Sequence, residues 1–67
     1  MNINTMQLQI VMAEKRMSLT QLSERSGVAK QNISTIIRRG TCTPKTAGKL
    51  AAGLDVSVSE IAKVETA

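Results

Sequence analysis

Residues 22–38 read LSERSGVAKQNISTIIR, and this stretch decides how the chain folds. A run of apolar residues at helical spacing is interrupted at Gly27 and resumes three residues later at Lys30. Glycine tolerates the left-handed backbone that commonly ends a helix. The stretch therefore predicts two short helices joined by a tight turn, with the polar residues KQN at the start of the second.

Helix start and stop signals extend this pattern over the whole chain. Asn4, Ser18 and Ser57 each precede, by three residues, a Gln or Glu that fits a capping box. Thr43 is a further N-cap candidate because a proline follows it at the first helical position. The predicted helices run from about 5 to 15, from 19 to 26, from about 30 to 38, from 44 to 54, and for one turn after 57. Residues 64–67 are expected to fray.

The sequence predicts an all-α fold of five short helices, in one domain spanning residues 1–67. No segment shows the sustained alternation of apolar and polar residues that indicates a strand. Two glycines, Gly48 and Gly53, interrupt the predicted fourth helix. They either allow close packing against another helix or soften the helix by up to ~1 kcal/mol each relative to Ala.

Composition removes several classes of function. The chain has no histidine, no aromatic residue, five acidic residues and a single cysteine. It therefore offers almost nothing for a metal site or a nucleophilic triad, and we expect no enzyme, no metal, no cofactor and no evident small-molecule effector. No apolar run is long enough to span a membrane, and no secretory signal is present, so we expect a cytoplasmic protein. Cys42 reads as a packing or surface residue more than as an oxidant sensor.

The basic residues are concentrated in the middle of the chain. The formal net charge is +4, and no acidic residue lies between Glu24 and Asp55. That window contains six basic residues: Arg25, Lys30, Arg38, Arg39, Lys45 and Lys49. Such a one-signed window favours a surface for a polyanion, with an ordinary solvated face as the alternative.

The turn at Gly27 meets the demanding spacing of a helix-turn-helix. Counted from Leu19, the fourth residue is apolar, the fifth is the small Ser23, and the ninth is glycine. The tenth, fifteenth and eighteenth residues are also apolar: Val28, Ile33 and Ile36. On these residues the chain resembles the phage repressor and Cro family of regulators, also called the xenobiotic-response-element type. The segments SLTQLSERSGVAKQNISTI and TPKTAGKLAAGLDVSVSEI carry the resemblance, which covers about residues 3–63.

The resemblance implies a lambda-repressor-like fold, with the helix-turn-helix at the second and third helices. It implies that the third helix, about residues 30–38, lies in the major groove of double-stranded DNA. The matching base contacts are Lys30, Gln31, Asn32 and Thr35. The matching phosphate contacts are Ser18, Thr20, Arg38, Arg39, Thr41, Thr43 and Lys45.

Regulators of this type usually bind as two-fold dimers. We therefore expect a homodimer, formed either in solution or only on DNA. The short fifth helix carries more apolar residues than it can easily hide, so the predicted dimer contact consists of Val56, Val58 and Ile61.

The chain also departs from the family pattern. Leu19 stands where a phosphate-contacting glutamine is usual, Ala29 replaces the usual hydroxyl cap of the third helix, and the segment IRRG has one extra residue. Met12 and Ile37 occupy positions where many members have an interhelical Arg–Glu pair. We expect these two residues to touch in a dry core, since replacing both charges together leaves neither buried alone.

These observations predict a sequence-specific transcriptional regulator of double-stranded DNA, with repression as the expected outcome. The alternative is a helical protein-interaction module, such as an antitoxin that neutralises a partner protein.

Overall fold

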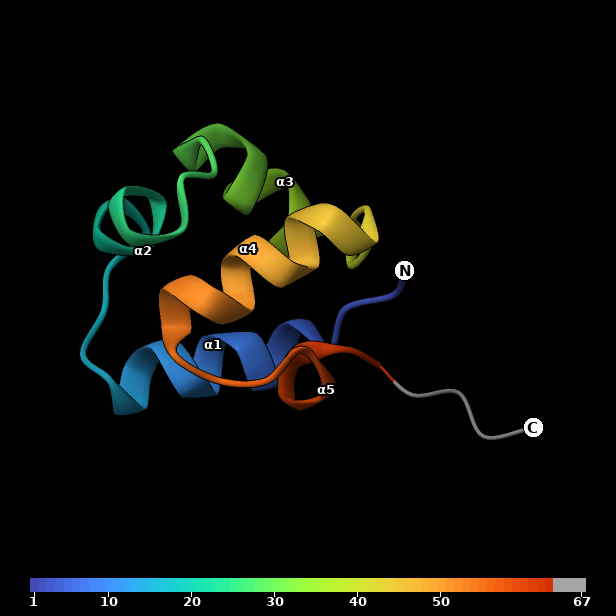
Figure 1. Cartoon of the computed structure of the whole chain (residues 1–67), viewed down its shortest axis with the longest axis horizontal. Coiled ribbons are helices and arrows are strands. Elements are labelled where there is room, and N and C mark those ends of the chain that lie inside the picture. The colour runs from blue at the N-terminus through green and yellow to red at the C-terminus, as the bar shows by residue number, and fades with distance from the viewer. Residues whose placement is uncertain (64–67) are drawn as a thin grey trace.

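The structure is a computed structural model, and it describes residues 1–63. It contains all five helices expected from the sequence (Figure 1). They are α1 (Thr5–Glu14), α2 (Leu19–Ser26), α3 (Lys30–Arg39), α4 (Pro44–Leu54) and α5 (Val58–Ile61). The all-α fold class is confirmed. The third helix runs one residue beyond its predicted end, and the fraying expected for residues 64–67 lies outside the described residues.

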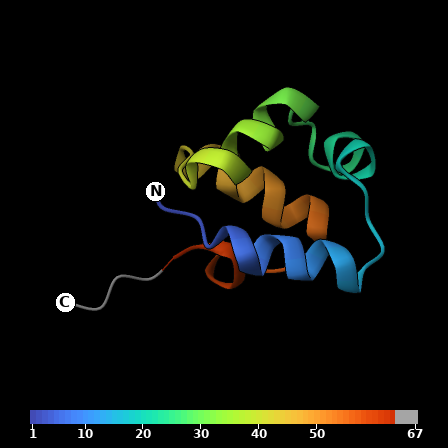
Figure 2. The same ribbon diagram turned by 180° about the vertical axis from the view of Figure 1, so that it is seen from behind.

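The helices pack around α4. Figures 1 and 2 show α4 between the α2–α3 pair on one side and α1 with α5 on the other. Every helix contributes at least one fully buried side chain to the common core: Leu8, Leu22, Ile33, Leu50, Leu54 and Ile61. Burying an aliphatic side chain of this size stabilises the fold by about 1.5–3 kcal/mol. No helix within residues 1–63 is long and apolar enough to cross a membrane.

Side-chain caps fix where α1 and α2 begin. The Asn4 side chain accepts a hydrogen bond from the backbone N–H of Gln7 at 3.0 Å. Ser18 and Gln21 form the predicted capping box: the Ser18 hydroxyl accepts from Gln21 N at 3.2 Å, and the Gln21 side chain accepts from Ser18 N at 2.9 Å. These caps satisfy backbone donors that the first helical turn otherwise leaves unpaired.

The predicted capping box at Ser57 was wrong. Ser57 precedes α5, but its side chain makes no capping hydrogen bond. Its hydroxyl oxygen instead lies 2.9 Å from that of Ser59, and the N–H of Glu60 donates to the backbone carbonyl of Ser57 at 3.0 Å. The neighbouring serine therefore competes for the hydroxyl that the pattern assigned to the cap.

Hydrogen bonds lock the turn between α2 and α3. Gly27 takes the left-handed conformation with φ 77°, as the sequence predicted. The Ser23 hydroxyl donates to the backbone carbonyl of Val28 at 2.7 Å, and the Val28 N–H donates to the Ser26 hydroxyl at 3.2 Å. The small residue that spacing required at position 23 thus also ties the two helices together.

The two glycines of α4 have different roles. A Cβ placed on Gly53 would lie 2.8 Å from Cβ of Ser26 and 3.0 Å from its backbone nitrogen, so α2 and α4 approach too closely for any side chain there. A Cβ placed on Gly48 would meet nothing within 4 Å. Close helix packing therefore explains Gly53, whereas Gly48 only weakens the helix.

Met12 and Ile37 line the same hollow between α1 and α3. Met12 is buried, but Ile37 is only half-buried. The expectation of a fully dry contact was therefore wrong at Ile37, because the hollow opens to the surface beside it. Leu19, which replaces the usual glutamine, lines this hollow as well and packs against the core.

A short stretch of extended backbone at the N-terminus escaped the sequence prediction. Two isolated antiparallel bridges pair Asn2 with Thr41 and Ile3 with Ala62. They connect the start of the chain to the α3–α4 loop and to the residues after α5. Within residues 1–63 these bridges do not extend into a strand.

Candidate nucleic-acid interface

The N-terminal turn of α3 presents three consecutive polar side chains to solvent. Lys30, Gln31 and Asn32 are all exposed. The residue before them, Ala29, makes no side-chain capping hydrogen bond, as expected from its lack of a hydroxyl. The first backbone amides of α3 therefore have no side-chain cap, and they lie at the same surface as the three polar side chains.

Thr35 lies one turn further along α3 and is less available. It is half-buried, and its hydroxyl donates to the backbone carbonyl of Gln31 at 2.9 Å. The hydroxyl proton is therefore occupied within the helix, while the oxygen and the methyl group remain for outside contacts.

A surface hollow of about 200 Å³ joins α3 to the start of α4. Asn32 and Thr35 line it from α3, and Thr41 and Thr43 line it from the loop that follows. Residues that the family pattern assigns to bases are thereby adjacent to residues assigned to phosphates, although they are separated along the chain. The two sets of residues therefore share one surface.

Basic side chains flank this surface. Arg38 and Arg39 end α3 and are exposed, and Gly40 with φ 77° turns the chain away immediately after them. Lys45 is exposed in the first turn of α4. Cations at the end of a helix interact favourably with its C-terminal carbonyls, so the two arginines also stabilise α3.

Two of the predicted phosphate contacts have hydroxyls with structural partners. The Thr43 hydroxyl accepts from Thr46 N at 3.3 Å and donates to the Thr46 hydroxyl at 2.9 Å. The Ser18 hydroxyl caps α2 through Gln21. Thr20, by contrast, is exposed in the first turn of α2 and has no capping role.

These roles predict different results for Ser18→Ala and its neighbour Thr20→Ala. Ser18→Ala removes the cap and is expected to lower the free energy of unfolding by about 1 kcal/mol. Thr20→Ala is expected to leave stability nearly unchanged. Urea denaturation followed by circular dichroism measures both. Equal stability of Ser18→Ala and the unmodified chain would show that the Ser18 hydroxyl contributes no net capping energy.

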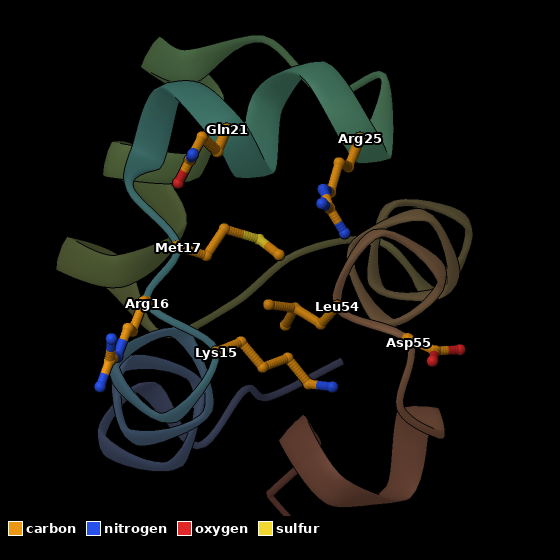
Figure 3. Close-up of a pocket in the computed structure, with 7 residues that line it drawn as sticks. All are labelled: Lys15, Arg16, Met17, Gln21, Arg25, Leu54 and Asp55. Atoms are coloured by element: carbon orange, nitrogen blue, oxygen red, sulfur yellow. The ribbon is translucent and has the colours of Figure 1, made fainter.

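Arg25, the first basic residue of the window, lies apart from the hollow beside α3. Arg25 lines a different hollow, of about 330 Å³, at the C-terminal end of α4, with Lys15 and Arg16. Figure 3 shows Lys15 and Arg25 pointing towards its middle over Met17 and Leu54, while Arg16 and Asp55 point outwards. Arg25 is therefore grouped with the end of α1 rather than with the α3–α4 loop.

Cys42 lines the hollow beside α3 and is half-buried. Burial raises the pKa of its thiol, and the N-terminal ammonium of Met1 opposes this shift by favouring the thiolate. Because burial dominates, the thiol stays protonated to a higher pH than an ordinary cysteine. This environment is the opposite of the one that makes a cysteine reactive.

We therefore expect slow alkylation of Cys42 at neutral pH. The rate constant for reaction with iodoacetamide should be lower than that of the urea-unfolded chain at the same pH. As the pH is raised, the rate constant of the folded chain should increase with a midpoint at a higher pH than that of the unfolded chain, since only the thiolate reacts. A folded chain that reacts faster at neutral pH than the unfolded one would contradict the burial of this thiol.

The predicted dimer contact is only partly available. Val56 and Val58 are half-buried and pack against the core. Ile61 is fully buried within its own chain and offers no surface to a second copy. The direction of the single turn of α5 explains this difference, because it points Ile61 inwards.

Comparison with known proteins agrees with this geometry. A family model, the Cro/C1-type helix-turn-helix DNA-binding domain, matches residues 7–67. Neither the curated proteins nor the solved structures give a match. The matched region includes α2, the turn at Gly27, α3 with its two C-terminal arginines, and the loop that follows. The chain belongs to the Cro/C1-type family of helix-turn-helix DNA-binding domains, and the family assigns it to the DNA-binding regulators of transcription.

Proposed function

We propose that the chain is a sequence-specific repressor of transcription that places α3 in the major groove of double-stranded DNA. The observation that carries this proposal is the hollow that sets Asn32 and Thr35 beside Thr41 and Thr43. A helix fits the major groove, and the loop after it then lies against the sugar–phosphate backbone. Binding of DNA requires only the polar side chains of these four residues and no catalytic group.

The exposed residues at the start of α3 are the proposed base readers. Lys30 carries a donor for guanine O6 and N7, whereas Gln31 and Asn32 carry paired donors and acceptors that match adenine N6 and N7. Thr35 has a smaller role, as an acceptor or as a methyl contact to thymine, because its proton is held by Gln31.

The proposed phosphate contacts surround the base readers. Arg38, Arg39 and Lys45 supply charge, and the exposed Thr20 and Thr41 supply hydroxyls. Ser18 and Thr43 contribute chiefly by fixing the starts of α2 and α4, whose N-terminal amides suit phosphate oxygens. Contacts of this kind set affinity and register, while the base edges set specificity.

We further propose that two copies bind about a two-fold axis, with Val56 and Val58 as the contact between them. Their half-burial leaves a small apolar surface, which suits a dimer that forms on the operator. Half-sites would then lie about one helical turn, roughly 34 Å, apart. The site requires neither a cofactor nor a metal, and we place the protein in the cytoplasm, where DNA is accessible.

Selection of binding sites from a random duplex pool tests this function. The expected result is an enriched inverted repeat, bound by two chains per duplex. Asn32→Ala serves as the matched variant, and it should select a site with a weaker preference at one position of each half. No enrichment by the unmodified chain would contradict specific DNA binding. One chain on a single half-site would contradict only the dimer.

One observation favours a second candidate function. The outer side of α1 exposes Met6 by 71 % and Ile10 by 42 %, and residues 5–13 contain no charge. Exposed methionine and a lack of charge are typical of protein–protein contacts. The second candidate is therefore an antitoxin-like module that neutralises a partner protein through α1.

Variants of α1 separate the two candidates. Met6→Ser with Ile10→Ser is expected to leave DNA affinity unchanged if α3 alone contacts the duplex. Tight stoichiometric binding to one protein, lost in this variant and accompanied by no DNA affinity, would favour the second function over the first.

A further inference from the structure

Residues 1–4 form an extended segment, here called the N-terminal bridge, that is hydrogen-bonded along both edges. On one edge, the Ile3 N–H donates to the carbonyl of Gly40 at 2.7 Å, and the Cys42 N–H donates to the carbonyl of Met1 at 3.0 Å. These bonds alternate with those of the other edge, as the pleat of extended backbone requires.

The other edge of the N-terminal bridge faces the end of the described chain. The Asn4 N–H donates to the carbonyl of Ile61 at 2.8 Å, and the Lys63 N–H donates to the carbonyl of Asn2 at 2.9 Å. Figure 2 shows the N-terminal segment running between the α3–α4 connection and the residues that follow α5. Two parts of the fold that share no helix are thus joined through four residues.

The N-terminal bridge is packed against the rest of the fold. The Ile3 side chain is only 3 % exposed and belongs to the hydrophobic core. A Cβ placed on Gly40 would lie 3.8 Å from the Ile3 carbonyl oxygen and from Cγ2 of Thr5, which shows how closely the loop follows the bridge. Moving the bridge would therefore move the backbone of the loop.

The loop between α3 and α4 carries two of the proposed phosphate contacts, Thr41 and Thr43. It leaves α3 after Arg39, passes Thr41 and enters α4 at the cap residue Thr43. The caps fix the two ends of the loop, at Gly40 and Thr43. Between the caps, the hydrogen bond from Cys42 to Met1 holds the backbone beside Thr41.

We propose that the N-terminal bridge is a positioning element that holds residues 40–43 against the DNA backbone and couples this loop to residues 61–63. The inference rests on the DNA-binding function proposed above. It assigns the bridge no contact with bases, so its loss should affect every DNA sequence alike. It also connects the loop to the region of α5, where the proposed dimer contact lies.

Ile3→Pro tests the first edge. Proline removes the N–H that donates to Gly40, and the extended backbone before it suits a residue preceding proline. Ile3→Ala is the control, because it also reduces the buried side chain but keeps the N–H. Both variants are compared at a temperature at which circular dichroism shows them fully folded.

The expected loss for Ile3→Pro relative to Ile3→Ala is roughly two- to tenfold in affinity, equal on specific and scrambled duplexes, as for one neutral hydrogen bond lost. Because residues 40–43 carry no charge, the slope of log affinity against log salt should stay the same in both variants. With Thr41→Ala already in place, Ile3→Pro should cost much less, since the contact that the bridge positions is then already gone. Equal affinities of folded Ile3→Pro and Ile3→Ala, or an undiminished loss in the Thr41→Ala background, would overturn the proposal.

Lys63→Pro tests whether residues 61–63 are coupled to the α3–α4 loop through the N-terminal bridge. It removes the N–H that donates to Asn2, and Ala62 already has the extended conformation that proline favours in its predecessor, with φ −80° and ψ 140°. Lys63→Ala removes the same charge but keeps the N–H. Only the proline variant is expected to speed hydrogen exchange at the Cys42 amide and to weaken DNA binding beyond the control.

The exchange measurement needs no DNA, so the two proposals fail separately. If the unmodified chain shows no salt-dependent DNA affinity, the proposed function fails, whatever the exchange rates are. If it binds DNA and the two Lys63 variants have equal Cys42 exchange and equal affinity, the coupling through the bridge is disproved.

Discussion

Gly53→Ala is expected to lower the free energy of unfolding by about 1–3 kcal/mol, the usual cost of forcing an extra carbon into a packed core. The added Cβ would meet Cα, Cβ and the backbone nitrogen of Ser26 at 3.0 Å or less. Backbone atoms cannot rotate away, so α2 and α4 would have to separate. A single core in a chain this small supplies only about 3–5 kcal/mol, so this one methyl removes much of the stability.

Gly48→Ala is the matched control on the same helix. The position is open, and alanine there is expected to raise stability by up to ~1 kcal/mol through helix propensity alone. Chemical denaturation gives the midpoint for both variants. If both substitutions raise the midpoint, α2 and α4 are not in the close contact that places α3 for DNA binding.

The second large effect separates reading of bases from binding of phosphates. Gln31→Ala is expected to cost about 1–3 kcal/mol on the preferred duplex, with relaxed preference at particular base pairs and a much smaller loss on scrambled DNA. Arg39→Ala should weaken binding to all sequences alike. It should also flatten the plot of log affinity against log salt by about one unit, because one fewer counterion is released per chain.

Lys15→Ala provides the control for loss of charge. Lys15 is exposed at the end of α1, lines the hollow that also contains Arg25, and belongs to neither proposed set of contacts. Its removal is expected to leave the salt dependence nearly unchanged, because it removes no proposed phosphate contact. If Gln31→Ala lowers both affinities equally while Arg39→Ala alters only base preference, the two surfaces are assigned the wrong way round.

Local chemistry made the helix-turn-helix predictable from the sequence. The left-handed glycine at 27, the capping box at Ser18 and the proline after Thr43 act over one helical turn, and each appears in the structure. Because these signals determine where the helices begin and end, they also place Lys30 and its neighbours at the start of α3.

Features that depend on distant pairing were not predictable. The N-terminal bridge is too short for alternation to show, and its partners lie about 40 and 60 residues along the chain. The prediction of Ile61 as a dimer contact was wrong for a related reason. One turn of helix with several apolar residues does not reveal which of them faces inwards. The predicted capping box at Ser57 was wrong because spacing alone does not take the competing hydroxyl of Ser59 into account.

A titration of the ¹⁵N-labelled chain with the selected duplex, followed by amide chemical shifts, tests whether α3 and the loop after it form the DNA surface. The predicted result is that the largest shifts fall at Lys30, Gln31 and Asn32 and across residues 38–43, with residues 5–13 of α1 little changed. Shifts confined to α1, or unchanged amides at the start of α3 in a saturated complex, would contradict DNA binding through α3.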